Sequence, residues 1–165
     1  MNVLRSLEQE RAKFAYEAVA KVKEVSDFMN KKEIQKKYAS YVKSAPVLIL
    51  TNGLSNTLAF YLSKIKEKEI EYTKIGEKLK KLGSGEKAFE NKAERIAYAY
   101  LFYQISKWLA EKANNGRGLT KGNDPLKFIC NEANVQLVMQ LTREAINLLN
   151  WMKRFADAML EKEEE

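Results

Sequence analysis

The side chains of this 165-residue sequence that could carry out chemistry are carboxylates and one cysteine, because the sequence contains no histidine. Without histidine there is no serine or cysteine triad, no zinc–histidine site and no ribonuclease that uses histidine as general acid or base. The single cysteine, Cys130, ends the apolar stretch "KFIC" and is predicted to be a buried, unreactive thiol. One cysteine also excludes an internal disulfide and any zinc site with several cysteines.

Carboxylates alone can hold Mg²⁺, which needs few protein ligands, so a metal-dependent nuclease is one hypothesis for this sequence. The acidic residues, however, stand mostly beside lysines at helix-surface spacing, as in "KEKEIEY" (66–72), which is typical of a solvated face. The glycine-rich stretch "GSGEK" (83–87) lacks the spacing of a phosphate-binding P-loop. We therefore expect a protein that is not an enzyme and that takes no metal, other cofactor or small-molecule substrate.

The net charge of +7 is carried by one half of the chain. Residues 1–87 hold 18 lysines and arginines against 11 acidic residues, whereas residues 88–165 hold 11 of each kind. A basic half favours a polyanionic partner such as nucleic acid. The alternative is a lysine-rich face that maintains solubility. Trp108 and Trp151 could stack on bases, but both lie near predicted core stripes, which favours packing.

The elements that would position these residues are predicted to be helices, because apolar residues recur every three or four positions throughout the chain. We expect helices over about 6–30, 31–45, 47–65, 66–82 and 87–113, and from 125 onward with a break near 131–134. The predicted fold is all-α: a compact bundle of about five to six helices forming one domain over 1–165, with 161–165 as a disordered acidic tail. No stretch is long and apolar enough to span a membrane, and no leader opens the chain, so we expect a cytoplasmic protein.

The stretch "PVLILTNGLSNTLAF" (46–60) allows two interpretations. Asn52 and Gly53 between apolar runs are a hairpin signal, but the apolar residues recur at helical spacing and a lone hairpin is marginal. We therefore predict one helix over 47–65, in which Asn52, Gly53 and Asn56 form a small polar groove. Glycine within a helix costs stability, so this groove is predicted to contact a neighbouring backbone, from the same bundle, another subunit or RNA.

Arg11 interrupts the apolar stripe of the first predicted helix. An arginine buried without a partner is strongly destabilising. We therefore expect Arg11 to pair with a carboxylate, to bond carbonyls at a helix end, or to project into an interface, and Glu144 in the final helix is a candidate partner. The alternative is that its guanidinium reaches water at the edge of the stripe.

The final predicted helix presents one polar, basic face. Arg143, Asn147, Asn150 and Arg154 recur at spacings of 4, 3 and 4, away from the apolar stripe, and Lys153 lies beside them. Such a face can meet phosphates in a sequence-independent way, and the binding should weaken as salt rises because each neutralised phosphate releases counterions. The same spacing is also found on ordinary solvent-exposed faces.

Three stretches, "LEQERAKFAYEAV", "YASYVKSAPVLILTNGLSNTLAFYLSK" and "LTREAINLLNWMKRFADAM", follow one another in the chain, with "YAYLFYQISKWL" before the last. In this order they resemble the small helical subunit of the type III-B CRISPR (Cmr) effector complex, the fifth subunit of that set. The resemblance spans most of the chain. The stretch "YTKIGEKLKKLGSGEKAFENK" (72–92) shows no pattern of that family.

The resemblance implies a noncatalytic subunit, present in more than one copy, that stacks into the minor filament of a ribonucleoprotein in antiviral defence. That filament follows the duplex of guide RNA and target RNA, so the expected partners are both RNAs, other Cmr subunits and copies of the chain itself. Within the matching stretches we expect Lys153 and Arg154 to contact RNA first, and Lys43 and Lys64 after them. The alternative is a helical nucleic-acid-binding protein that acts alone.

Overall fold

The computed structural model describes residues 6–163, which form helices and no strand. The helices are α1 (Leu7–Phe28), α2 (Lys32–Asn52), α3 (Leu54–Ile65), α4 (Tyr72–Gly83), α5 (Ala93–Lys107), the one-turn α6 (Ala113–Gly116), α7 (Pro125–Asn131) and α8 (Val135–Met159). A 3₁₀ turn (Phe89–Asn91) precedes α5, and a π-helical turn (Trp108–Lys112) extends it. The all-α prediction is confirmed, with seven helices longer than one turn in the described residues instead of five to six.

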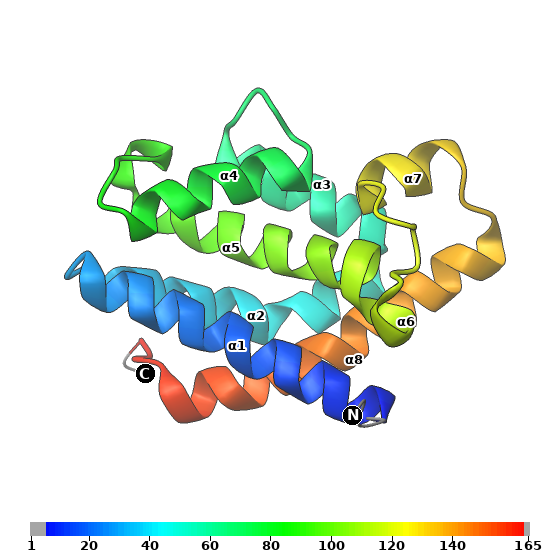
Figure 1. Cartoon of the computed structure of the whole chain (residues 1–165), viewed down its shortest axis with the longest axis horizontal. Helices are drawn as coiled ribbons and strands as arrows, with labels where there is room; N and C mark the ends of the chain where they lie inside the picture. The colour runs from blue at the N-terminus through cyan, green and yellow to red at the C-terminus, as the bar shows by residue number, and fades with distance from the viewer. Residues whose placement is uncertain (1–5, 164–165) are drawn as a thin grey trace, which may run out of the picture.

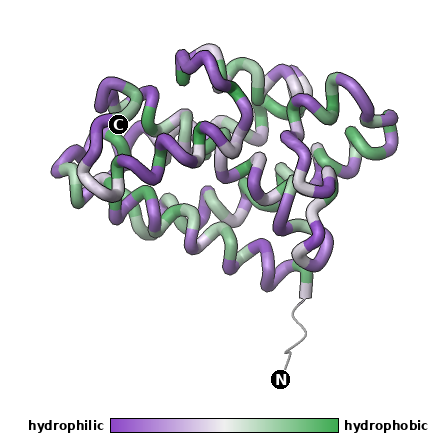
Figure 2. Tube along the Cα trace, turned by 45° about the horizontal axis from the view of Figure 1, so that its top comes forward, coloured by the Kyte–Doolittle hydropathy of each residue, from purple (hydrophilic) through white to green (hydrophobic). Residues whose placement is uncertain are grey.

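Helix α5 runs through the middle of the molecule, with α4 on one side and α1 and α2 on the other (Figure 1). It packs on α2, α3 and α4, and residues 95–102 are all buried. The sequence of this part, "IAYAYLFYQI" (96–105), accounts for the burial, since a helix that is apolar on nearly all sides needs neighbours on all sides. Helix α8 packs on α1 and α2 at the lower edge of the bundle. Hydrophilic and hydrophobic segments alternate along the outer helices, as amphipathic packing requires (Figure 2).

The start of α1 has the capping box that its sequence predicts. The backbone N–H of Gln9 donates to Oγ of Ser6 at 3.1 Å, and the backbone N–H of Ser6 donates to Oε1 of Gln9 at 2.8 Å. Two backbone donors that the helix itself cannot satisfy are thereby bonded, which sets the first turn of α1.

The second helix ends later than predicted. Helix α2 continues through Pro46 to Asn52, whereas the predicted boundary between 31–45 and 47–65 lay at the proline. Proline removes one hydrogen bond from a helix interior. The buried face of α2 nevertheless continues on both sides of it, with Val42, Ala45 and Ile49 each no more than 1% exposed. Packing of this face outweighs the lost bond, so the helix passes through Pro46.

Gly53, and not Pro46, separates α2 from α3. Its backbone has φ 89° and ψ 158°, a conformation essentially restricted to glycine. No atom lies within 4 Å of the position that a Cβ at Gly53 would occupy. Glycine is therefore required here by the conformation of the backbone. It is not required to make room for a neighbouring helix. The predicted single helix over 47–65 is wrong, because Asn52 ends one helix and Asn56 lies in the first turn of the next.

We expect Gly53→Ala to lower the free energy of unfolding by about 1–3 kcal/mol, the usual cost of holding another residue in such a conformation. Gly83→Ala is the matched control, because Gly83 also has open space around it but has no positive φ. Urea unfolding of both variants measures the difference. Equal stability of the two variants would contradict the role assigned to Gly53.

Residues 66–71, predicted to begin a helix over 66–82, form an irregular connection instead. Lys66 adopts a left-handed conformation (φ 60°), which ends α3. Arg95, on the central helix, donates from Nε to the carbonyl of Ile65 at 2.7 Å and pairs through Nη2 with Glu67 at 3.0 Å. A buried guanidinium thus satisfies the carbonyl at the end of α3 and holds the connection against α5.

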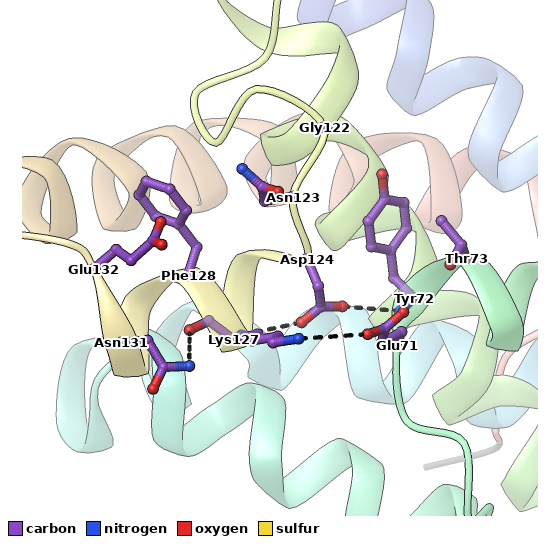
Figure 3. Close-up of a pocket in the computed structure, with 10 residues that line it drawn as sticks. All are labelled: Glu71, Tyr72, Thr73, Gly122, Asn123, Asp124, Lys127, Phe128, Asn131 and Glu132. Atoms are coloured by element: carbon purple, nitrogen blue, oxygen red, sulfur yellow. Dashed lines mark hydrogen bonds and ion pairs between the residues drawn. The ribbon is translucent and has the colours of Figure 1, made fainter.

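Asp124 caps two helices at once (Figure 3). Its Oδ1 accepts from the backbone N–H of Tyr72 at 2.9 Å, at the start of α4. Its Oδ2 accepts from the backbone N–H of Lys127 at 3.1 Å, at the start of α7, where the Asp-Pro pair predicted a helix. A polar hollow of about 370 Å³ lies around these contacts. One side chain therefore joins the start of α7 to the start of α4, and Asp124 is 52 residues from Tyr72 in the sequence.

Asp124→Ala should lower the free energy of unfolding by about 2 kcal/mol, since a lost N-cap costs about 1 kcal/mol and this residue provides two. Glu71→Ala is the matched control, because Glu71 is the N-cap residue of α4 but its side chain makes no capping bond. Thermal unfolding followed by circular dichroism compares the two. A loss no larger for Asp124→Ala than for Glu71→Ala would show that the double cap contributes little.

None of the helices within 6–163 combines the length and the hydropathy needed to cross a membrane. Of the predicted tail over 161–165, the first three residues are not helical. The backbone N–H of Glu161 nevertheless donates to Oε1 of Gln35 on α2 at 3.1 Å, so this residue is attached to the bundle. Glu164 and Glu165 lie outside the described residues.

Candidate nucleic-acid interface

The outer face of α8 carries the basic residues predicted to contact RNA. Arg143, Asn150, Lys153 and Arg154 are exposed, and Asn147 is half-buried. The opposite face is fully buried and consists of Leu141, Ala145, Leu148 and Met152. The predicted separation of a basic face from an apolar stripe is therefore confirmed. None of the three cations on this face makes an ion pair with another residue of 6–163, so their charges are available to a partner.

Two shallow hollows flank this face of α8. The first, of about 540 Å³, lies toward α1 and is lined by Glu8, Asn147, Asn150, Trp151 and Arg154. The second, of about 330 Å³, lies toward α2 and is lined by Leu50, Val138, Met139, Thr142, Arg143, Ile146 and Asn147. Asn147 borders both hollows, so the basic face is one continuous surface between α1 and α2.

Trp151 lies at the surface beside Arg154, whereas Trp108 is 1% exposed. The Trp151 ring stacks on Phe155, with ring centroids 5.9 Å apart, and Phe155 meets Tyr16 of α1 edge-on at 5.5 Å. Packing was predicted for both tryptophans. Trp108 lies in the core, and Trp151 packs on it with part of its side chain. A half-exposed indole beside an arginine can also stack on a base. The part played by Tyr16 has no signal in the sequence, because it depends on how α1 and α8 cross.

Arg11 pairs with Glu144, as predicted. Its Nε donates to Oε1 and its Nη2 to Oε2 of Glu144, both at 2.7 Å, and the same carboxylate accepts from Nε1 of Trp108 at 3.0 Å. The alternative, in which the guanidinium reaches water, is wrong, because the Arg11 side chain is only 11% exposed. The hydrogen bonds to Glu144 raise the pKa of the guanidinium, against the opposing effect of burial. Arg11 therefore joins α1 to α8 inside the bundle.

This buried pair also affects the first hollow. Nη1 of Arg11 donates to Oε2 of Glu8 at 2.9 Å, and the indole N–H of Trp151 donates to the other oxygen of Glu8. Among the described residues that line the hollow, Glu8 alone is acidic, and both of its oxygens are engaged. Arg154 consequently determines the sign of the charge that this hollow presents to a ligand.

Lys43 and Lys64, the other two cations predicted to contact RNA, lie on α2 and α3 and not on α8 itself. Lys43 is exposed on α2, seven residues before Leu50 and thus on the same helix face, and Leu50 lines the second hollow with Arg143. Lys64 lies on α3, where its ammonium is 5.6 Å from the centre of the Phe60 ring. Helix α3 is in the upper layer beside α4, whereas α8 follows the lower edge (Figure 1).

Asn52 and Asn56 line a separate small hollow at the junction of α2 and α3. Its volume is about 150 Å³, and its lining residues are Leu48, Asn52, Asn56, Thr57 and Phe60. The predicted approach of a bundle helix at Gly53 is wrong, since nothing lies within 4 Å of a Cβ there. Both asparagines are exposed, so contact of this hollow with another subunit or RNA stays a prediction.

Cys130 is exposed, contrary to the buried thiol predicted from "KFIC". Helix α7 lies at the surface, and Pro125 is the only one of its residues that is fully buried. The helix is too short for its apolar residues to define one buried face. Among the described residues there is also no cluster of three or more cysteine, aspartate or glutamate side chains arranged to hold a metal ion.

A family model described as CRISPR-associated protein (Cas_Cmr5) matches residues 7–159 of the chain. The match runs from the first residue of α1 to the last residue of α8. It includes the 72–92 stretch, in which the sequence showed no pattern of the family. A match of this extent establishes that the chain belongs to the Cmr5 family of CRISPR-associated proteins, the Cmr5 subunit of the type III-B CRISPR complex.

Proposed function

We propose that this chain is a noncatalytic structural subunit of the Cmr ribonucleoprotein, and that its copies stack into the minor filament along the duplex of guide RNA and target RNA. The observation that carries the proposal is the outer face of α8. In a chain of the Cmr5 family, this face presents Arg143, Lys153 and Arg154 to solvent without an ion pair within 6–163. Its proposed partners are other Cmr subunits, further copies of itself and both RNAs, in antiviral defence.

The chemistry of this face suits the RNA backbone better than base edges. Guanidinium and ammonium groups neutralise phosphates, and the amides of Asn147 and Asn150 can donate to phosphate oxygens or bond 2′-hydroxyls. Contacts of this kind position a duplex without reading its sequence, as a subunit that must accept any guide requires. Lys43 on α2 extends the positive surface beyond α8.

The noncatalytic part of the proposal rests on the side chains available. Histidine is absent from the sequence, and the inward-facing carboxylates are already bonded. Glu144 accepts from Arg11 and Trp108, Glu67 pairs with Arg95, and Asp124 caps two helices. We expect the purified chain to leave RNA intact in the presence of Mg²⁺. Degradation that is lost on substituting one carboxylate would instead support the nuclease hypothesis.

Affinity purification of the tagged chain from its native cells tests the proposal directly. We expect the other Cmr subunits and guide RNA to be retained with it, as identified by mass spectrometry and RNA sequencing. The alternative, a helical nucleic-acid-binding protein that acts alone, predicts retention of nucleic acid without a set of CRISPR subunits. That result would contradict the assembly role.

A further inference from the structure

A groove of about 600 Å³ between α1, α4 and α5 lies outside the proposed RNA contact. Helix α5 forms its floor, and α1 and α4 form its walls. The residues that line it extend over 14–21 of α1, 76–83 of α4 and 100–107 of α5. At a rise of 1.5 Å per residue, the groove is roughly 10 Å long, which is about two turns of a helix.

The floor of the groove is apolar. Tyr100 and Tyr103 of α5 form it, and Phe14 and Ala18 of α1 and Leu79 of α4 make the walls apolar as well. Gly76 lets the ring of Tyr103 lie directly on α4, because a Cβ at Gly76 would be 2.4 Å from the ring. At the end of α4, Gly83 leaves open space instead, with no atom within 4 Å of its Cβ position. The groove therefore narrows at Gly76 and widens at Gly83.

The rim of the groove is basic. Lys21, Lys80, Lys107 and Lys112 line it, against Glu17 as the only acidic residue. Lys80 and Lys112 are exposed and make no ion pair with any residue of 6–163. Four ammonium groups around one apolar floor favour a ligand with an apolar body and negative charges at its edges.

Tyr100 contributes its ring, and not its hydroxyl, to the groove. Its side chain lines the groove and is 3% exposed, yet its hydroxyl is buried without a hydrogen-bond partner among the described residues. Burial raises the pKa of this phenol, so the group remains a protonated donor. The hydroxyl itself is not accessible to solvent, so it is the ring of Tyr100 that contributes to the surface of the groove.

We infer that this groove binds an amphipathic, acidic helix from another protein subunit of the complex. Apolar side chains at positions i, i+3 or i+4, and i+7 of that helix would lie on the α5 floor, as in other helix-in-groove contacts. Its carboxylates would face the four lysines of the rim. The inference rests on the proposed assembly role, because it takes the partner from the same complex.

A protein helix fits the groove better than RNA does. An unpaired base needs the open face of an aromatic ring to stack on. The Tyr103 ring already lies against Gly76, and the ammonium of Lys107 stands over it, 5.5 Å from the ring centre. A duplex presents its phosphates on a wide, rigid surface, which leaves the recessed apolar floor without a partner.

Carbodiimide cross-linking of the purified, assembled complex tests the inference, because this reagent joins a lysine amine to a carboxylate in direct contact. We expect Lys80 and Lys112 to form amide links with aspartates or glutamates of another protein chain, in segments with the helical apolar spacing. Lys81, on the same helix but outside the groove, is the internal reference and should not form these links. Treatment with RNase before cross-linking should leave the yield unchanged.

Two variants sharpen the test. Gly83→Leu places a side chain in open space at the wide end of the groove and should lower the cross-link yield at least fivefold while the chain stays folded. Tyr100→Phe removes only the buried hydroxyl and leaves the ring in the groove, so neither the stability of the free chain nor retention of the partner should fall. Lys81→Glu should affect neither readout.

The inference is wrong if the complex assembles and its other lysines cross-link, but Lys80 and Lys112 do not reach another protein. Acetylation of lysines in the intact complex gives a second check, because an occupied groove protects Lys80 and Lys112 from the reagent. The inference is also wrong if RNase treatment abolishes this protection, since the occupant would then be RNA. Failure of the wild-type chain to enter the complex at all would contradict the proposed function instead, so the two failures can be told apart.

Discussion

Replacing Glu144 with alanine should lower the free energy of unfolding by about 3–5 kcal/mol, the cost of breaking a buried ion pair from one side. The substitution removes the partner of both Arg11 nitrogens that donate to it and of the Trp108 indole N–H. Nε and Nη2 of Arg11 and the indole N–H of Trp108 then lose their acceptor inside the bundle, and Arg11 keeps only the bond from Nη1 to the exposed Glu8. For a chain of this size the midpoint of thermal unfolding should fall by roughly 10 °C.

Asp157→Ala is the matched control for this prediction. Asp157 is an acidic residue of the same helix, but it is exposed. Its one ion pair, with Lys162 at 3.8 Å, is also exposed, so its loss should cost no more than about 1 kcal/mol. The double variant Arg11→Met/Glu144→Leu should be much less destabilised than either single variant, because neither charge remains buried alone. If Arg11→Met by itself causes no loss of stability, the pair does not hold α1 to α8.

Charge reversal on the outer face of α8 should have the largest effect on function. We expect Lys153→Glu combined with Arg154→Glu to weaken binding of target RNA to the assembled complex by roughly 100-fold at low salt, because two phosphate contacts per copy are lost and repulsion is added. Every target sequence should be affected alike. The slope of log K against log salt should also become shallower by about two for each copy that contacts the duplex.

Lys68→Glu combined with Lys121→Glu provides the control, since it changes the net charge by the same amount. Both lysines are exposed, and both lie in connections away from α8. Titration of labelled RNA at several salt concentrations compares the two double variants. Equal losses would mean that net charge alone matters, and an unchanged affinity for Lys153→Glu/Arg154→Glu would remove α8 from the RNA contact.

The helices and their buried faces could be predicted because periodicity is a local property. The spacing of apolar residues in α8, the capping box at Ser6 and the all-round apolar centre of α5 each concern residues within a few turns of one another. The same reasoning showed that Arg11, a charge on an apolar stripe, needs a partner, and Glu144 was one candidate, which the structure confirms.

Helix ends were predicted less well, because two local preferences compete there and packing decides between them. Pro46 and Gly53 both break helices, and the buried face of α2 carries the helix through the first of them to the second. The connection over 66–71 depends on Arg95, some 30 residues away, which bonds the end of α3. Cys130 is exposed because α7 lies on the outside of the bundle, a position that "KFIC" does not encode.

The sequence by itself determined the fold class, the family and the basic face of α8, and it offered Glu144 as a candidate partner of Arg11. Only the tertiary structure decided which of these surfaces lie together. It places Leu50 of α2 beside Arg143 of α8, Tyr16 beside Phe155, and four lysines around the groove between α1, α4 and α5. The physical reason is that the face of one helix is set by its own 3.6-residue period, whereas a groove or a shared surface is set by how separate helices cross.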